Sequence, residues 1–166
     1  MHGYVLTVER RIRARPEAIF ALVSDASAHP LIDGSGSVRQ VRADAPQRLE
    51  LGSTFGMFMK MGIGYSMVNT VIEYEENKLI AWQTRPPGQM GHLTAGRIWR
   101  YELADANCDG DGDGDSTLVR ESWDLSRDRQ RWLLKRVVGL PTKTRNNMER
   151  TLERIEELTT VPSGLG

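Results

Sequence analysis

Two charged residues, Arg97 and Glu121, occupy positions in strand-like stretches where apolar side chains face inward. Side chains alternate along a strand, so Arg97 lies on the same side as Trp99 and Tyr101. By the same alternation, Glu121 lies on the same side as Trp123. Burying an ion against a fully packed core would cost several kcal/mol. The pattern therefore predicts a sheet whose inner face lines a cavity that holds water or a polar ligand.

A guanidinium and a carboxyl group in one cavity could carry out acid–base chemistry. If residues 105–115 form a hairpin loop, a symmetrical register places Trp99 beside Glu121. Arg97 then lies beside Trp123 and diagonal to Glu121, within reach of a long side chain. Arg97 would polarise a carbonyl, while an apolar environment would raise the pKa of Glu121 and suit it to acid or base catalysis. The alternative is a structural ion pair at the rim of the cavity.

Sulfur and aromatic side chains make up a second group of candidate binding residues. Phe55, Met57 and Met59 alternate along one strand, and Met67 extends the group on the next. Thioether side chains repack easily, which suits a pocket for apolar ligands, although ordinary core or a dimer face gives the same pattern. Asn69 could donate or accept a hydrogen bond in such a pocket. The predicted ligand-binding residues are Phe55, Met57, Met59, Met67, Asn69, Arg97, Trp99, Tyr101, Glu121, Trp123 and Met148.

No metal or cofactor is expected. Residues 109–115 alternate Asp and Gly like the start of a calcium loop, but Arg120 stands where a bidentate Glu is needed. A solvated hairpin tip is the preferred interpretation, and weak calcium binding is the alternative. His29 precedes a proline in a turn, and the sequence has no paired histidines at metal-ligand spacing and no dinucleotide-binding glycine motif.

The composition excludes several classes of protein. Twenty-two basic and 22 acidic residues balance, so no net field attracts nucleic acid or an anionic membrane. No apolar run approaches the roughly 20 residues of a spanning helix, so no stable membrane insertion is expected. Cys108 is the only cysteine, which excludes an intrachain disulfide and a cysteine-based zinc site. The start has no apolar stretch behind a basic segment, so we expect a cytoplasmic protein.

The length of 166 residues predicts one domain over residues 1–160 and a frayed tail over residues 161–166. Alternating, β-branched and aromatic residues predict the strands. These cover residues 4–13, 38–41, 49–51, 55–61, 65–74, 78–84, 95–103 and 117–125.

Helices are expected near the two ends of the chain. Pro16 opens a short helix that Asp25 is expected to end by bonding to the backbone, and a second short turn follows it. Apolar residues three and four positions apart predict one long helix over residues 128–160. Its apolar face is formed by Leu133, Val137, Leu140, Met148, Leu152, Ile155 and Leu158. Pro141 should kink that helix near its middle.

Several phrases occur in an informative order. They are RPEAIFALVSD at residues 15–25, VIEYEENKLIAW at 71–82, WRYEL at 99–103, TLVRESW at 117–123 and MERTL at 148–152. With the order of elements, they make the chain resemble the START-like helix-grip superfamily, specifically its polyketide cyclase/dehydrase branch, often called SRPBCC proteins. The resemblance implies an α+β fold: a curved antiparallel sheet of six to seven strands wrapped around a long C-terminal helix, with two short helices after strand one. It also implies a hydrophobic cavity, but no shared catalytic residue.

Three functions follow from these observations. The leading hypothesis is a carrier or sensor that binds a small hydrophobic molecule, such as a lipid, polyketide or aromatic metabolite. The second is an enzyme of the cyclase, dehydratase or hydrolase type that uses Arg97 and Glu121. The third is a regulatory partner of another protein, with Phe58 or Trp132 at the contact. A monomer or a homodimer is expected.

Overall fold

The elements follow the predicted order of one strand, short helices, a run of strands and a final helix. The computed structural model describes residues 3–88, 91, 95–106, 116–137 and 139–160. The strands are β1 (Val5–Ile12), β2 (Val38–Val41), β3 (Thr54–Met61), β4 (Ile63–Glu75), β5 (Leu79–Arg85), β6 (Arg97–Asp105) and β7 (Thr117–Asp124). The helices are α1 (Pro16–Val23), the 3-10 turn η1 (Ala26–Ala28), α2 (His29–Ile32), α4 (Arg131–Arg136) and α5 (Leu140–Thr159).

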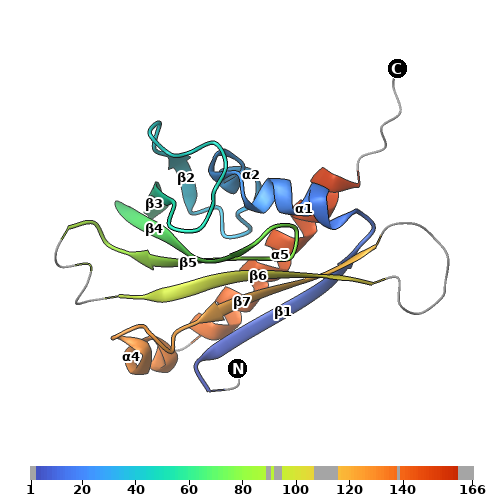
Figure 1. The fold of residues 1–166 in the computed structure, drawn as a ribbon. Coiled ribbons are helices and arrows are strands. Elements are labelled where there is room, and N and C mark those ends of the chain that lie inside the picture. The colour runs from blue at the N-terminus through green and yellow to red at the C-terminus, as the bar shows by residue number, and fades with distance from the viewer. Residues whose placement is uncertain (1–2, 89–90, 92–94, 107–115, 138, 161–166) are drawn as a thin grey trace.

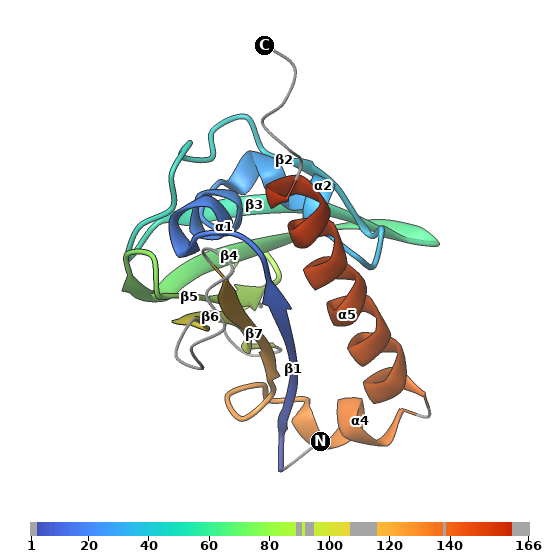
Figure 2. The ribbon, with the colours of Figure 1, turned by 90° about the vertical axis from the view of Figure 1, so that its right-hand side faces the viewer.

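All these strands belong to one antiparallel sheet, which curves around the last helix. Within the described residues it has seven strands in the order β1-β7-β6-β5-β4-β3-β2 (Figure 1). Figure 2 shows α5 running along the concave side of the sheet, with α1 and α2 beside it. The predicted α+β helix-grip fold is confirmed.

The first short helix begins as the sequence predicts. Arg15 has an extended backbone, and Pro16 follows it in the first turn, where the missing N–H of proline costs nothing. Asp25, however, does not end α1 as expected. Its carboxylate accepts a 2.8 Å hydrogen bond from the backbone N–H of Ser27 and thereby caps η1.

One predicted strand is absent. Residues 49–50 have no regular secondary structure and Leu51 lies in a turn, and Leu49 is nevertheless fully buried. Its backbone N–H donates to the carbonyl of Ser24 at 2.7 Å, so this segment is fixed to the end of α1 instead of pairing in the sheet.

The register of β6 and β7 differs from the predicted one by two residues. Trp99 pairs with Trp123, and Tyr101 pairs with Glu121. The predicted pairing of Trp99 with Glu121 is therefore wrong, although all four side chains lie on the side that alternation predicts. Arg97 lies four residues from Tyr101 along β6, about 13 Å in a strand that rises about 3.3 Å per residue.

The C-terminal region forms two helices instead of one kinked helix. Gly139 has a φ of 78° and separates α4 from α5, while Pro141 lies in the first turn of α5, where proline is well tolerated. The break also explains why two residues of the predicted apolar face, Leu133 and Val137, are exposed.

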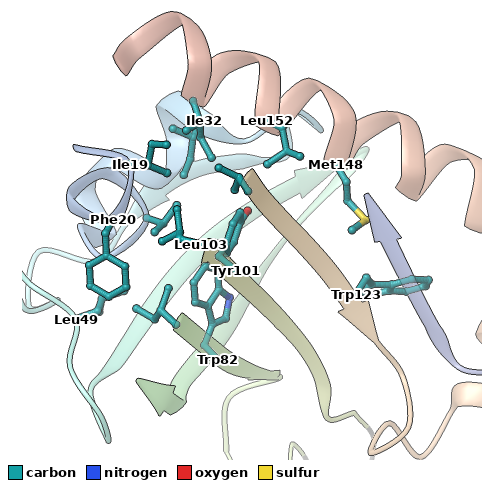
Figure 3. Packing of buried hydrophobic residues seen from close by; sticks show 14 of the residues in the cluster. Ile19, Phe20, Ile32, Leu49, Trp82, Tyr101, Leu103, Trp123, Met148 and Leu152 are labelled. Atoms are coloured by element: carbon teal, nitrogen blue, oxygen red, sulfur yellow. The ribbon is translucent and has the colours of Figure 1, made fainter. Parts of the chain in front are cut away.

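The core lies between the sheet and the helices. Figure 3 shows Ile19 and Phe20 of α1 packed close to Leu103, with Leu152 of α5 above the sheet. One turn before Leu152 in α5, Met148 points toward the strands. These residues are all buried.

A close backbone contact fixes the loop after α2 to α5. A Cβ on Gly34 would lie 2.2 Å from the carbonyl oxygen of Asn147. The backbone N–H of Gly34 also donates to Oγ1 of Thr151 at 3.0 Å. This contact brings Asp33, the residue before Gly34, to the concave side of the sheet.

Some predictions concern residues outside those that the structure describes. They are the Asp and Gly segment at 109–115 with its calcium alternative, the place of Cys108, and the tail at 161–166. The domain boundary at residue 160 stays a prediction.

Candidate ligand-binding cavity

A cavity of about 500 Å³ lies between α5 and the concave side of the sheet. Its wall takes residues from α2, the loop after it, strands β2 to β7, and the helical region that begins at Gln130. This volume falls within the range of sites for small molecules and cofactors.

Nearly all of the predicted ligand-binding residues line this cavity. They are Met57, Met59, Met67, Asn69, Arg97, Trp99, Tyr101, Glu121, Trp123 and Met148. Phe55 is not among the lining residues. Its ring packs edge-on against His29 and Trp82, with centroids 5.3 and 5.8 Å away, so it supports the wall from behind. That the lining residues bind a ligand stays a prediction.

Aromatic rings form much of the wall. Trp82 and Tyr101 stack with ring centroids 5.6 Å apart, and Figure 3 shows the two rings next to each other. On the neighbouring strand pair, Trp99 and Trp123 lie 6.3 Å apart. Cross-strand aromatic pairs of this kind stabilise the sheet and also present flat apolar faces to the cavity.

Glu121 is a buried acid at the cavity wall. It is 2% exposed, and its Oε1 accepts a 3.0 Å hydrogen bond from the hydroxyl of Tyr101. Its other oxygen, Oε2, has no hydrogen-bond partner among the described residues. Within the described part of the chain, no cation pairs with Glu121 and no backbone N–H donates to it. Nothing there balances a negative charge on this group.

Burial raises the pKa of Glu121 from 4.5 to about 8. The hydrogen bond from Tyr101 opposes this shift, and the negative charge of Asp33 adds to it. Burial likewise raises the pKa of the Tyr101 hydroxyl, and the nearby Glu121 carboxyl adds to that effect. At neutral pH the pair is therefore mostly uncharged, with an acidic proton beside an apolar cavity.

Arg97 pairs with a different acid from the predicted one. Its Nε lies 3.6 Å from Oδ2 of Asp128, and the Asp128 side chain is completely buried. The other oxygen of Asp128 accepts a 2.8 Å hydrogen bond from the backbone N–H of Gln130. The predicted ion pair between Arg97 and Glu121 is therefore wrong, because the shifted register separates them along the strands.

Asn69 holds two strands together at the wall. Its Oδ1 accepts a 2.7 Å hydrogen bond from Thr84, and its Nδ2 donates to the carbonyl of Phe55 at 3.4 Å. Asn69 was predicted as a hydrogen-bonding group for a ligand. Its internal partners show that it also orders β3, β4 and β5 at this point.

His29 and Asp33 are among the lining residues that the sequence analysis did not predict. His29 is 4% exposed, stacks on Trp82 with centroids 5.0 Å apart, and has its Nε2 3.0 Å from the carbonyl oxygen of Val23. Burial lowers the pKa of His29, so the ring is neutral at physiological pH. Asp33 also lines the cavity, and its carboxylate accepts hydrogen bonds from the backbone N–H groups of Ser35 and Val38. The helix that carries His29 is too short to show a periodic pattern.

The described residues contain no group of three or more His, Cys, Asp or Glu side chains that could hold a metal ion. No helix within the described ranges is both long and apolar enough to span a membrane.

The sequence of this chain matches a known protein family. The sequence profile described as "Polyketide cyclase / dehydrase and lipid transport" matches residues 5–159. An uncharacterized protein of Mycobacterium tuberculosis strain H37Rv is 36% identical over 92 residues, which cover 54% of this chain and 37% of that protein. Its counterpart in strain CDC 1551 is 34% identical over the same length. The match therefore spans little more than a third of the length of these curated relatives.

Solved structures share the fold. Norcoclaurine synthase from Thalictrum flavum has a TM-score of 0.60 at 13% identity, over 96% of this chain and 94% of that one. Major latex-like protein 151 from Panax ginseng has a TM-score of 0.59 at 11% identity, over 96% of this chain and all of that one. A protein of Chromobacterium violaceum has a TM-score of 0.60 at 13% identity, over 96% and 99% of the two chains. At these identities the likeness concerns the fold alone.

Proposed function

Because this chain belongs to the polyketide cyclase/dehydrase and lipid transport family, we propose that it encloses a small hydrophobic molecule as a carrier or sensor. The observation that carries this proposal is the cavity of about 500 Å³ beneath α5. A cavity of that size holds a lipid chain segment, a polyketide or an aromatic metabolite, the classes that the sequence predicts.

The chemistry of the wall supports an apolar ligand. Met57, Met59, Met67 and Met148 border the cavity together with aromatic rings. Unbranched thioether side chains adapt to ligands of different shape, and aromatic faces favour flat ligands. Binding is favourable because the apolar surfaces of both the ligand and the cavity wall are removed from water.

Ligand uptake can be tested with a variant that fills the cavity. Purified protein would be examined by native mass spectrometry and by lipid extraction, and then by thermal shifts with fatty and aromatic compounds. Ligands that bind the folded state should raise the melting temperature. Met148→Trp should abolish both co-purification and the thermal shift. Leu158→Trp is the matched control, because Leu158 lies on the same helix but is 45% exposed. If no compound co-purifies with or stabilises the unmodified protein, the proposal is wrong.

A second candidate function is acid catalysis at Glu121. The specific observation in its favour is a buried carboxyl with a pKa of about 8, hydrogen-bonded to Tyr101 at the wall of the cavity. Such a group can deliver or accept a proton near neutral pH. In this proposal Arg97 plays no part beside Glu121, since the register separates them.

The enzymatic candidate has its own test. Any molecule extracted from the protein would be incubated with the unmodified protein and with Glu121→Gln, and its products analysed by mass spectrometry. Turnover by the first but not by the second supports catalysis. Equal conversion by both, or no conversion by either, leaves Glu121 without a catalytic role.

A further inference from the structure

The charges of this chain are balanced overall but not along its length. Twenty-two basic residues match 22 acidic ones. Between Arg129 and Met148, however, the sequence holds six basic residues and no acidic one. The basic residues are Arg129, Arg131, Lys135, Arg136, Lys143 and Arg145. The chain therefore has a local positive region around α4, although its net charge is zero.

Large apolar side chains are exposed in the same place. Trp132 is 58% exposed, Leu133 is 49% exposed and Val137 is 46% exposed. The guanidinium of Arg136 lies 5.8 Å from the centre of the Trp132 ring, a distance at which a cation and an aromatic ring attract each other. We call the exposed residues Arg129, Arg131, Trp132, Leu133, Arg136 and Val137 the α4 patch.

The α4 patch adjoins the wall of the cavity. Gln130 and Leu134 lie between residues of the α4 patch in the sequence, and both line the cavity. Leu140 and Lys143, in the first turns of α5, line it as well. Figure 2 shows α4 at the lower end of α5. A surface that covers the α4 patch would thus also face this end of the cavity.

We propose that the α4 patch docks on an anionic lipid surface, with its apolar side chains in the interfacial layer and its arginines at the lipid phosphates. A short helix with exposed Trp and Leu side chains and several flanking basic residues has the chemistry of interfacial membrane binding. Each arginine near an anionic surface adds to the attraction, and neither the electrostatic nor the apolar contribution needs a partner of complementary shape.

A lipid surface fits better than an acidic protein or a nucleic acid. The long exposed indole and aliphatic side chains gain little from a highly charged polymer, whereas the interfacial layer of a bilayer accepts them. The docking is peripheral and involves no spanning helix. It is therefore compatible with the predicted lack of stable insertion, but it differs from the expectation that zero net charge excludes attraction to an anionic membrane.

Vesicle co-sedimentation tests the electrostatic part. The full chain should sediment with vesicles of phosphatidylcholine and phosphatidylglycerol, but not with phosphatidylcholine alone, and added salt should release it. Arg129→Gln with Arg136→Gln should weaken this binding roughly ten- to thirtyfold, from about a factor of five for each charge. The matched control, Arg39→Gln with Lys60→Gln, removes two exposed charges from β2 and β3 and should leave binding unchanged.

Trp132 provides a test of the apolar part. Its fluorescence should shift to shorter wavelength on addition of anionic vesicles, and the shift should vanish in Trp132→Phe, which keeps an aromatic ring. Trp132→Ala should weaken vesicle binding, whereas Phe58→Ala, an exposed aromatic residue on β3, should not. All these side chains are at least partly exposed, so thermal denaturation should show that the variants fold.

Several results would overturn the proposal. They are equal binding to neutral and anionic vesicles, binding to neither kind, equal loss in the control double variant, or binding to a short DNA duplex in place of vesicles. The proposal does not depend on ligand uptake. A protein that binds anionic vesicles but takes up no apolar compound would keep the lipid-docking surface and lose the carrier function.

Discussion

Tyr101 and Glu121 face each other across β6 and β7, and the tyrosine hydroxyl donates a 3.0 Å hydrogen bond to Oε1 of the acid. Oε2 has no partner in the described part of the chain. Because Oε1 accepts from Tyr101, the proton of the neutral acid resides on Oε2. The cavity wall thus contains a buried uncharged acid whose donor is left for a ligand or water to satisfy.

The stability of the protein should depend on the proton of Glu121. Its pKa is about 8 in the folded state, against 4.5 as the ordinary value. The bound proton stabilises the folded state fully below a pH of 4.5. This stabilisation falls by about 1.4 kcal/mol per pH unit as the pH rises from there, and it is lost above a pH of about 8. Glu121→Gln cannot titrate, so its free energy of unfolding relative to the unmodified protein should rise over this window. Urea denaturation at a series of pH values measures this, and a pH-independent difference would contradict it.

Tyr101→Phe should push the pKa of Glu121 higher still. The hydroxyl of Tyr101 stabilises the ionised carboxylate, so its loss favours the neutral acid. The unpaired Oε1 should also cost about 1–3 kcal/mol of stability. Carbon-13 NMR titration of the Glu121 carboxyl reports the pKa directly. Tyr65→Phe, at another point of the cavity wall, is the control and should leave this titration unchanged. A lower pKa in Tyr101→Phe would count against the arrangement.

Arg97 and Asp128 should show energetic coupling. Arg97→Met leaves the buried carboxylate of Asp128 without its nearby cation and should destabilise the protein by about 1–3 kcal/mol, because Arg97 is itself 30% exposed. Asp128→Asn removes the charge and keeps the acceptor for Gln130, so it should cost less. The double variant should be more stable than the sum of both effects implies. Strict additivity in chemical denaturation would exclude the pairing.

Gly34→Ala should disturb the packing of α5. The new methyl group would lie 2.2 Å from the carbonyl oxygen of Asn147 and 2.5 Å from the backbone nitrogen of Thr151. A helix backbone moves little, so we expect a loss of about 3 kcal/mol or more in thermal denaturation. Thr151→Val removes the hydrogen bond from the Gly34 N–H and the 3.1 Å hydrogen bond from the Thr151 hydroxyl to the carbonyl of Asn147, and it should cost about 1–2 kcal/mol. Equal melting temperatures for these two variants would show that the loop yields easily.

The alternation of side chains along each strand correctly predicted which residues face the cavity. This prediction does not need the register, because every second residue of a strand points to the same side however the strands are paired. Trp99, Tyr101, Glu121 and Trp123 all line the cavity on the predicted side. The partner of Glu121 was predicted wrongly, because the register depends on the turn. Asp105 pairs with Thr117, whereas a loop over 105–115 would have paired Ala104 with Ser116.

Residues in short elements were harder to predict. His29 belongs to a helix of four residues, and Asp33 caps the end of that helix. Neither position produces a period that can be compared with a pattern. The split of the C-terminal helix was missed for a related reason. The apolar spacing of three and four residues continues across this region, but the extended backbone of Val137 ends α4 and the left-handed backbone of Gly139 precedes α5.

The position of β1 has a consequence for biosynthesis. Val5 pairs with Asp124, so the first strand of the chain finds its neighbour only after the last strand has been made. Until then a ribosome-bound chain exposes the apolar face of β1 and an unpaired edge of backbone groups. Contacts so distant along the chain slow folding, so we expect the yield of folded protein to rise when chaperones are present during its synthesis.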